Sequence, residues 1–203
     1  MSKLLFYTFF ILLTTIPDYT FGQRNQQNGY VVTNKNDTLY GFVIDRKEKM
    51  FLKIYKKVRL KRKGHFTKKF SPGQLHGYKI ENSEFESLWY STVGNPFDAV
   101  YVSKPNQGKK IFMKVVDRGY LTLYYLESID QESDLHFYIP FFKRADQHYI
   151  IRVTQGLLGL KKKQLIVYFD DCEELVNKIT AGTLKTPLEI SSFYNAWFDS
   201  KNK

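Results

Sequence analysis

Residues 51–61, FLKIYKKVRLK, alternate between apolar and basic side chains. One set of alternate positions is mostly apolar and holds Leu52, Ile54, Val58 and Leu60. The other set is mostly basic and holds Lys53, Tyr55, Lys57, Arg59 and Lys61. A period of two residues places the two sets on opposite faces of a β-strand. We therefore predict a strand here, with one face on a core and the other in solvent.

Similar β-rich runs lie on both sides of this strand. They cover residues 29–33, 38–44, 65–70, 75–80, 85–90, 99–103, 110–116, 120–126, 135–142 and 149–153. Turn-forming residues separate many of them, at residues 34–37, 63–64, 105–108 and 117–119. A turn about every eight to twelve residues is typical of antiparallel hairpins and meanders. The sequence therefore predicts a mainly β protein, built as a sandwich or a partly open barrel.

After residue 155 the spacing of apolar residues changes to three and four, which is helical. Asp171 followed by Glu174 has the spacing of a capping box, so we expect two helices that meet near residues 170–171. Thr186, Pro187 and Glu189 form a stronger helix start. We therefore predict a C-terminal α segment of two or three short helices packed on the β domain.

The first 22 residues have the pattern of a secretory signal peptide. Lys3 precedes an apolar run at residues 4–13, which is shorter than the ~20 residues that span a bilayer. We expect cleavage after Gly22, a secreted or periplasmic mature chain and no membrane-spanning segment after cleavage. The predicted organisation is a signal peptide at 1–22, an antiparallel β domain at 23–155 and a helical segment at 156–203.

Positive charge is concentrated in one region of the chain. Residues 46–69 hold twelve Lys or Arg and one acidic residue, Glu48, a surplus equal to the formal net charge of +11 for the whole chain. Alternate residues of a strand lie about 6.5–7 Å apart on one face, inside the Debye length of ~8 Å at physiological salt. Such a row attracts anions, and we predict an anion-binding site at Lys53, Lys57, Arg59, Lys61 and Arg62. The alternative is a solvated edge strand whose lysines prevent aggregation.

Export determines which anions are relevant. An exported chain meets anionic lipid, lipopolysaccharide and acidic glycan, so we expect one of these or an envelope protein as the partner, and no nucleic acid. In the cytosol, basic residues interleaved with aromatic ones would instead suggest a nucleic-acid surface.

No motif in the sequence predicts a reaction. The four histidines have no metal-ligand spacing, no phosphate loop or nucleophile motif is present, and we expect no cofactor, no metal and no catalytic residue. Glu84 and Glu86 share one face of a strand, which can support acid–base chemistry but is more often a solvent-facing pair. Cys172 is the one cysteine, and we expect it to pack as a small buried hydrophobe.

Two motifs resemble uncharacterised secreted proteins of Bacteroidota-type bacteria. The first is GYVVTNKNDTLYGFV at residues 29–43, which resembles an N-terminal hairpin of the form GxVxTxxGDTLxG, with Asn36 in place of the glycine. The second is YFDDCEELVNKI at residues 168–179, similar to YFxDCPxL, with Glu173 in place of the proline. The resemblance implies an exported β-rich fold and no activity. Whether the Asp37-Thr38 pair is glycosylated is left open.

These patterns together predict an exported, non-enzymatic envelope or interaction module that binds an anionic surface through its basic hairpin. The alternative is an envelope enzyme that acts on glycan or lipid through a site that the sequence does not reveal.

Overall fold

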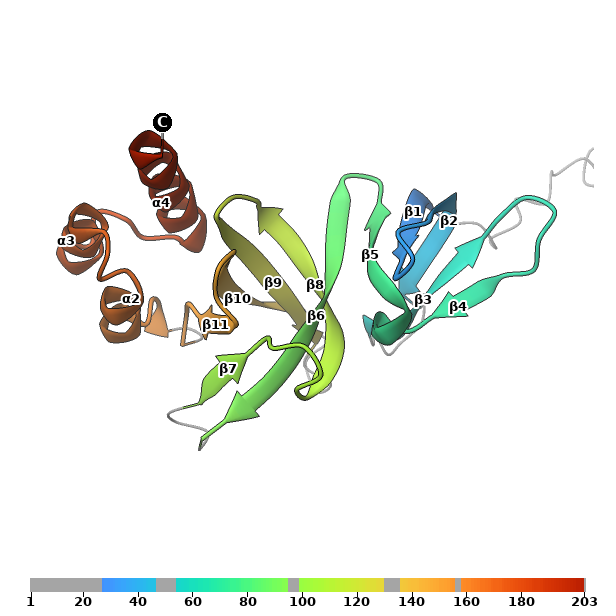
Figure 1. Cartoon of the computed structure of the whole chain (residues 1–203), viewed down its shortest axis with the longest axis horizontal. Coiled ribbons are helices and arrows are strands. Elements are labelled where there is room, and N and C mark those ends of the chain that lie inside the picture. The colour runs from blue at the N-terminus through green and yellow to red at the C-terminus, as the bar shows by residue number, and fades with distance from the viewer. Residues whose placement is uncertain (1–26, 47–53, 95–98, 130–135, 156–157, 203) are drawn as a thin grey trace, which may run out of the picture.

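The computed structural model describes residues 27–46, 54–94, 99–129, 136–155 and 158–202. Within these ranges, antiparallel strands form about half of the residues and three α-helices follow them (Figure 1). This arrangement confirms the predicted fold class. The predicted signal peptide at 1–22 lies outside the described residues, and the predicted boundary at residue 155 stays a prediction.

The first strands form an open antiparallel sheet, which we call the N-terminal sheet. Its spatial order is β4, β3, β2, β1, β5, and β5 pairs with β6. Asn36 has a left-handed backbone, with φ of 63°, in the turn between the first two strands, a conformation that asparagine tolerates well. The strands are β1 (Gln27–Thr33), β2 (Thr38–Arg46), β3 (Ile54–Lys61), β4 (Lys68–Phe70) and β5 (Leu75–Ile80), with a short 3-10 turn, η1 (Pro72–Gln74), before the last.

The remaining strands close into a six-stranded barrel. Its order is β6, β7, β11, β10, β9, β8, and β8 pairs back onto β6 from Glu84↔Val115 to Tyr90↔Lys109. The strand β6 therefore belongs both to the barrel and to the edge of the N-terminal sheet. The barrel strands are β6 (Ser83–Val93), β7 (Val100–Val102), β8 (Lys109–Asp117), β9 (Leu121–Ile129), β10 (His136–Arg144) and β11 (Tyr149–Arg152).

Each of these two sheets has its own apolar core. Alternate residues of the barrel strands fill the barrel, including Met113, Tyr124, Phe141 and Ile150. A second cluster lies on one face of the N-terminal sheet and reaches Phe112 of β8; its buried members are Val31, Val43, Val58, Leu60, Phe70, Leu75, Tyr78, Ile80 and Phe85. The other face of the N-terminal sheet is therefore free to present polar side chains.

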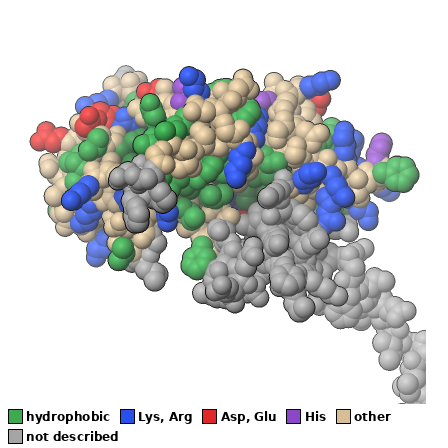
Figure 2. All heavy atoms as spheres, turned by 90° about the horizontal axis from the view of Figure 1, so that it is seen from below, with side chains coloured by type: hydrophobic (Ala, Val, Ile, Leu, Met, Phe, Trp, Pro, Cys, Tyr) green, Lys and Arg blue, Asp and Glu red, His purple; other side chains and the backbone are tan. Residues whose placement is uncertain are grey.

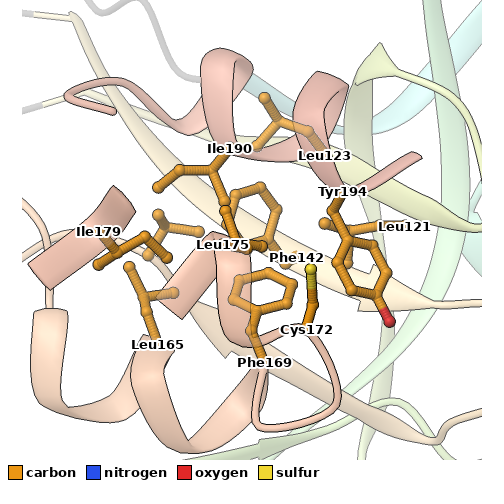
Figure 3. Packing of buried hydrophobic residues seen from close by; sticks show 11 residues of the cluster. Leu121, Leu123, Phe142, Leu165, Phe169, Cys172, Leu175, Ile179, Ile190 and Tyr194 are labelled. Carbon is orange, nitrogen blue, oxygen red and sulfur yellow. The ribbon is translucent and has the colours of Figure 1, made fainter. Parts of the chain in front are cut away.

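The three helices cover the outside of β9 and β10 and make the third core cluster (Figure 3). They are α2 (Lys162–Tyr168), α3 (Glu173–Ala181) and α4 (Pro187–Lys201). Leu121, Leu123 and Phe142 of the barrel contact helix residues that include Phe169, Leu175, Ile190 and Tyr194. Cys172 is buried in this cluster, and burial raises the pKa of its thiol. This packing confirms the prediction that Cys172 is buried as a small hydrophobe.

The predicted capping role of Asp171 is wrong. The residue that precedes α3 is Cys172, and no side chain caps that helix. Asp171 instead accepts a hydrogen bond from Arg144 Nη2 at 2.6 Å and another from the Tyr194 hydroxyl at 2.6 Å. Because the Arg144 side chain is only 8% exposed, its charge requires a nearby carboxylate. The acid thus stabilises the contact between the barrel and the helices.

Candidate anion-binding face

Strand β3 has the two faces that its sequence pattern predicts. The side chains of Val58 and Leu60 are buried, whereas Lys57 and Lys61 are exposed and Arg59 is partly buried. Phe70 of β4 lies opposite Val58 and is also buried. The apolar side of the hairpin therefore anchors it on the core, and its basic side faces outward.

Strand pairing extends the basic row across the sheet. Lys69 of β4 lies opposite Arg59, and Lys79 of β5 lies opposite Tyr30 of β1. Residues that oppose each other in an antiparallel pair have their side chains on the same face. The paired strands thus build one surface, which we call the cationic face: its charged members are Lys57, Arg59, Lys61, Lys69 and Lys79, and its aromatic members are Tyr30, Tyr40 and Phe42.

Two of the three aromatic side chains of the cationic face are open to solvent, and Tyr30 is partly buried. Tyr40 is 69% exposed and Phe42 is 44% exposed, and Phe42 lies opposite Lys61. The rings of Tyr30 and Tyr40 meet edge to face with their centroids 5.6 Å apart. Clusters of solvent-exposed aromatic side chains are a common feature of binding surfaces.

Three lysines of this face have no acidic neighbour within the described part of the chain. There, no carboxylate lies within the 4.0 Å salt-bridge distance of Lys57, Lys61 or Lys69. Figure 2 shows Lys and Arg side chains gathered at the end of the molecule that carries β3 and β4. Like charges at strand spacing add their fields, which makes this face a candidate site for an anion.

Acidic residues border the cationic face on its β6 side. Glu84 lies opposite Lys79, and Glu86 lies opposite Gly77. Arg118 binds both carboxylates, with Nη2 at 2.8 Å from Glu84 Oε1 and Nη1 at 2.6 Å from Glu86 Oε1. The paired carboxylates predicted to face solvent are therefore engaged by an arginine.

Glu86 also accepts a hydrogen bond from the hydroxyl of Tyr124, which points into the barrel. Burial raises the pKa of Tyr124, and the charge of Glu86 raises it further. Lys143 shares the barrel-facing side of β10 with Phe141, and burial lowers the pKa of its amine against the opposing charges of Glu86 and Asp146. The contacts among Tyr124, Glu86 and Arg118 thus satisfy these polar groups within the fold, which is a structural arrangement.

The predicted anion-binding residues fall into three groups. Lys57, Arg59 and Lys61 lie together on the cationic face. Arg62 is exposed in the loop that follows β3, beside that face. Lys53 lies outside the described residues. The same loop carries Phe66, whose side chain is completely exposed.

Sequence reasoning missed the other members of the face. Lys69 belongs to the basic stretch but is not among the predicted site residues, and nothing predicted that Tyr30, Tyr40, Phe42 and Lys79 lie near it. Their own strands show the same period of two, with Val31 and Val43 on the buried side. The signal that could have found them is this alternation, combined with the register of three neighbouring hairpins.

The fold and the face together define a class: an antiparallel β protein with basic and aromatic side chains on one face of its N-terminal sheet. Comparisons with models of protein families, with curated proteins and with solved structures gave no match. Among the described residues, no helix is long and apolar enough to cross a membrane. The same residues contain no group of three or more His, Cys, Asp or Glu side chains placed to hold a metal ion.

Proposed function

We propose that this protein is an exported, non-enzymatic binding module that holds an acidic polysaccharide on its cationic face. The observation that carries the proposal is the shared surface: cations from β3, β4 and β5 stand on the same side of the sheet as Tyr30, Tyr40 and Phe42. A basic hairpin that served only to keep an edge strand soluble would need no exposed aromatic residues beside it.

The cations supply attraction to a polymer with repeated acidic groups. Each exposed ion pair is worth only about 0.2–1 kcal/mol. Several such pairs act together when one partner is a chain that carries an acid on successive units. Lys57, Lys61 and Lys69 are exposed and lie on two neighbouring strands, so one polymer segment can contact all three.

The aromatic rings favour a glycan over a lipid surface. The C–H face of a sugar ring is flat and apolar, and it can lie on the ring of Tyr40 or Phe42, which are rigid and need little ordering. A layer of lipid head groups offers charges but no such flat faces. Nucleic-acid bases do offer them, and the proposed export separates this chain from nucleic acid.

The first prediction concerns the charges. We expect polygalacturonate to bind the mature chain and its fully methyl-esterified form to bind at least about tenfold more weakly, because esterification removes the acids. The triple variant K57Q/K61Q/K69Q should lose about three- to a hundredfold in affinity, at about 0.2–1 kcal/mol for each charge. Raising salt from about 50 to 500 mM should release the polymer. Isothermal titration calorimetry measures all three effects.

A matched control is the triple variant K162Q/K163Q/K185Q, which removes the same charge from the helical segment. Its affinity should stay within about twofold of the parent chain. Equal losses in the two triple variants would reject the cationic face as the site. Stronger binding to anionic lipid vesicles or to single-stranded DNA would reject the glycan as the partner.

The second prediction concerns the aromatic rings of the cationic face. Replacing Tyr40 by alanine removes an exposed side chain and should leave the fold unchanged, yet reduce polygalacturonate affinity about fivefold through lost ring contact. The salt dependence should not change, because no charge is removed. Calorimetric titrations at low and high salt separate the two contributions. If the Y40A variant binds polygalacturonate as tightly as the parent chain, the Tyr40 ring does not contribute to binding, and the affinity results from charge alone.

A further inference from the structure

The charged and aromatic members of the cationic face follow the order of the strands. That order is β4, β3, β2, β1, β5 (Figure 1). Lysines and an arginine lie on β4 and β3, another lysine lies on β5, and the aromatic residues lie on β2 and β1 between them. A ligand that crosses the strands from β4 therefore meets cations first, then aromatic rings, and then a cation again.

The register of the strands connects these side chains into one path. Lys61 of β3 lies opposite Phe42 of β2. Tyr40 shares that face of β2, lies opposite Tyr30 of β1, and meets the Tyr30 ring edge to face with the centroids 5.6 Å apart. Tyr30 in turn lies opposite Lys79 of β5. Because residues that oppose each other share a face, the path from Lys61 to Lys79 is continuous.

A ligand that lay along β3 would miss most of this path. It would contact Lys57, Arg59 and Lys61, which alternate along that strand. Neighbouring strands lie about 4.8 Å apart, so β1 and β5 are about 10 and 14 Å from β3. Tyr30 and Lys79 would then stay outside the contact. A ligand that runs across the strands uses the cations and the rings together.

The path has an end on each side. Strand β4 is the outermost strand of the N-terminal sheet. On the other side, Glu84 lies opposite Lys79, and Glu84 and Glu86 share one arginine, Arg118, at 2.8 and 2.6 Å. Two carboxylates against one guanidinium leave a surplus of negative charge, which repels an acidic polymer. The path is therefore limited to the strands from β4 to β5.

We propose, building on the glycan-binding function above, that one acidic polysaccharide chain lies across the strands from β4 to β5. Its acidic groups pair with Lys69 and Lys61 at one end and with Lys79 at the other, and its sugar faces contact Tyr40 and Tyr30 in between. Five strands at a spacing of about 4.8 Å span about 19 Å between the outer two. A sugar unit is about as long as one strand spacing, so the site holds about five units.

The length of the site determines how affinity depends on the length of the ligand. Oligogalacturonates from the dimer to the octamer are the probes, and NMR titration of the mature chain measures their dissociation constants. Affinity should rise at least about tenfold from the dimer to the pentamer, because each added unit meets a further strand. The octamer should bind at most about fourfold more tightly than the pentamer, because it adds only alternative positions on the same site.

Replacing Lys79 tests the direction of the bound chain. Lys79→Gln should weaken pentamer binding about threefold, as expected for one exposed ion pair. It should leave dimer affinity within about 1.5-fold, because a dimer binds best between the neighbouring cations of β3 and β4. K79R keeps the charge and should bind the pentamer like the parent chain. K104Q is the matched control, because Lys104 is an exposed lysine that follows β7 of the barrel; both affinities should stay unchanged.

Three results would each overturn the crossing arrangement: an unchanged pentamer affinity in K79Q, an equal loss for dimer and pentamer in K79Q, or a gain from pentamer to octamer as steep per unit as the gain from dimer to pentamer. If polygalacturonate still binds the parent chain when one of these results is found, the crossing arrangement alone is wrong. If neither the polymer nor any oligomer binds, the proposed function itself is wrong.

Discussion

Gly119, in the turn between β8 and β9, shows how closely α4 approaches the barrel. A Cβ atom at this position would lie 2.3 Å from Nδ2 of Asn195. The Asn195 amide accepts a hydrogen bond from the Leu121 backbone N–H at 2.8 Å and donates one to the Leu121 carbonyl at 2.9 Å. The glycine thus makes room for a side chain that pairs with the start of β9.

We predict that Gly119→Ala lowers the free energy of unfolding by about 1–3 kcal/mol, because the methyl group displaces Asn195 and breaks both hydrogen bonds. Urea denaturation measures the change. The matched control is Gly73→Ala, where the nearest atom to a new Cβ is Ser71 Oγ at 3.9 Å; its change should stay below about 1 kcal/mol. Equal effects of the two substitutions would show that the contact between Gly119 and Asn195 is unimportant.

At the residue scale, sequence reasoning worked where one side chain acts within its own element and failed where it acts across elements. Thr186 and Glu189 are predicted as a helix start and form a complete capping box at α4. Asp171 has the same kind of spacing, yet it binds Arg144 and Tyr194 from other elements. Asp171 is 27 residues from Arg144 along the chain. The spacing of residues around Asp171 therefore cannot show that this acid pairs with a buried arginine.

The first turn of α4 has a pH dependence that results from its cap. The backbone N–H groups of Lys185 and Thr186 donate to Glu189 Oε2 at 2.7 and 2.9 Å. These hydrogen bonds lower the pKa of Glu189 below its ordinary value, and the bond from the Lys185 N–H has the larger effect. A lowered folded-state pKa means that the ionised acid stabilises the fold above its unfolded-state pKa, and that this contribution is lost as the pH falls through the folded-state value.

We therefore predict that the parent chain is more stable than Glu189→Gln at neutral pH, and that the difference shrinks towards zero as the pH falls to about 2. Urea denaturation at a series of pH values measures this difference. Glu173→Gln is the matched control, because Glu173 is an exposed first-turn acid of α3 and α3 has no side-chain cap; its difference should be smaller. A difference for E189Q that is independent of pH would contradict the capping role of the charge.

At the element scale, alternation predicted the faces of strands but not their neighbours. Residues 57–61 alternate as predicted, with Val58 and Leu60 on the core. Which residue stands beside Lys61 depends on the register of β2 and β3, and this pairing contains an irregularity between Ile44 and Arg46. A shift by one residue would move Phe42 to the buried face. The aromatic half of the candidate site therefore could not be predicted from the sequence alone.

At the scale of the whole molecule, the class of fold was predictable and the closure of the barrel was not. Turn signals identify hairpins between consecutive strands, such as β8 with β9. The barrel also needs β8 to pair with β6 and β11 to pair with β7, and neither pair is consecutive along the chain. Such pairings depend on how the whole sheet curves, which local composition does not encode.

The completed fold separates two kinds of surface. The helices cover the outside of β9 and β10, whereas the cationic face lies at the opposite end of the molecule on the N-terminal sheet (Figure 1). Its exposed aromatic residues and its lysines meet only through the pairing of β1, β2, β3 and β4. The proposed binding role therefore depends on the folded sheet and not on the basic stretch as a peptide.

The most direct test of the cationic face as a binding site is a map of amide and aromatic NMR shifts while polygalacturonate is added to the mature chain. We predict that the largest changes fall on Tyr30, Tyr40 and Phe42 and on the backbone of Lys57, Lys61 and Lys69, and that α3 and α4 remain unchanged. Changes spread over all lysines, or centred on the helices, would contradict a specific site on the cationic face.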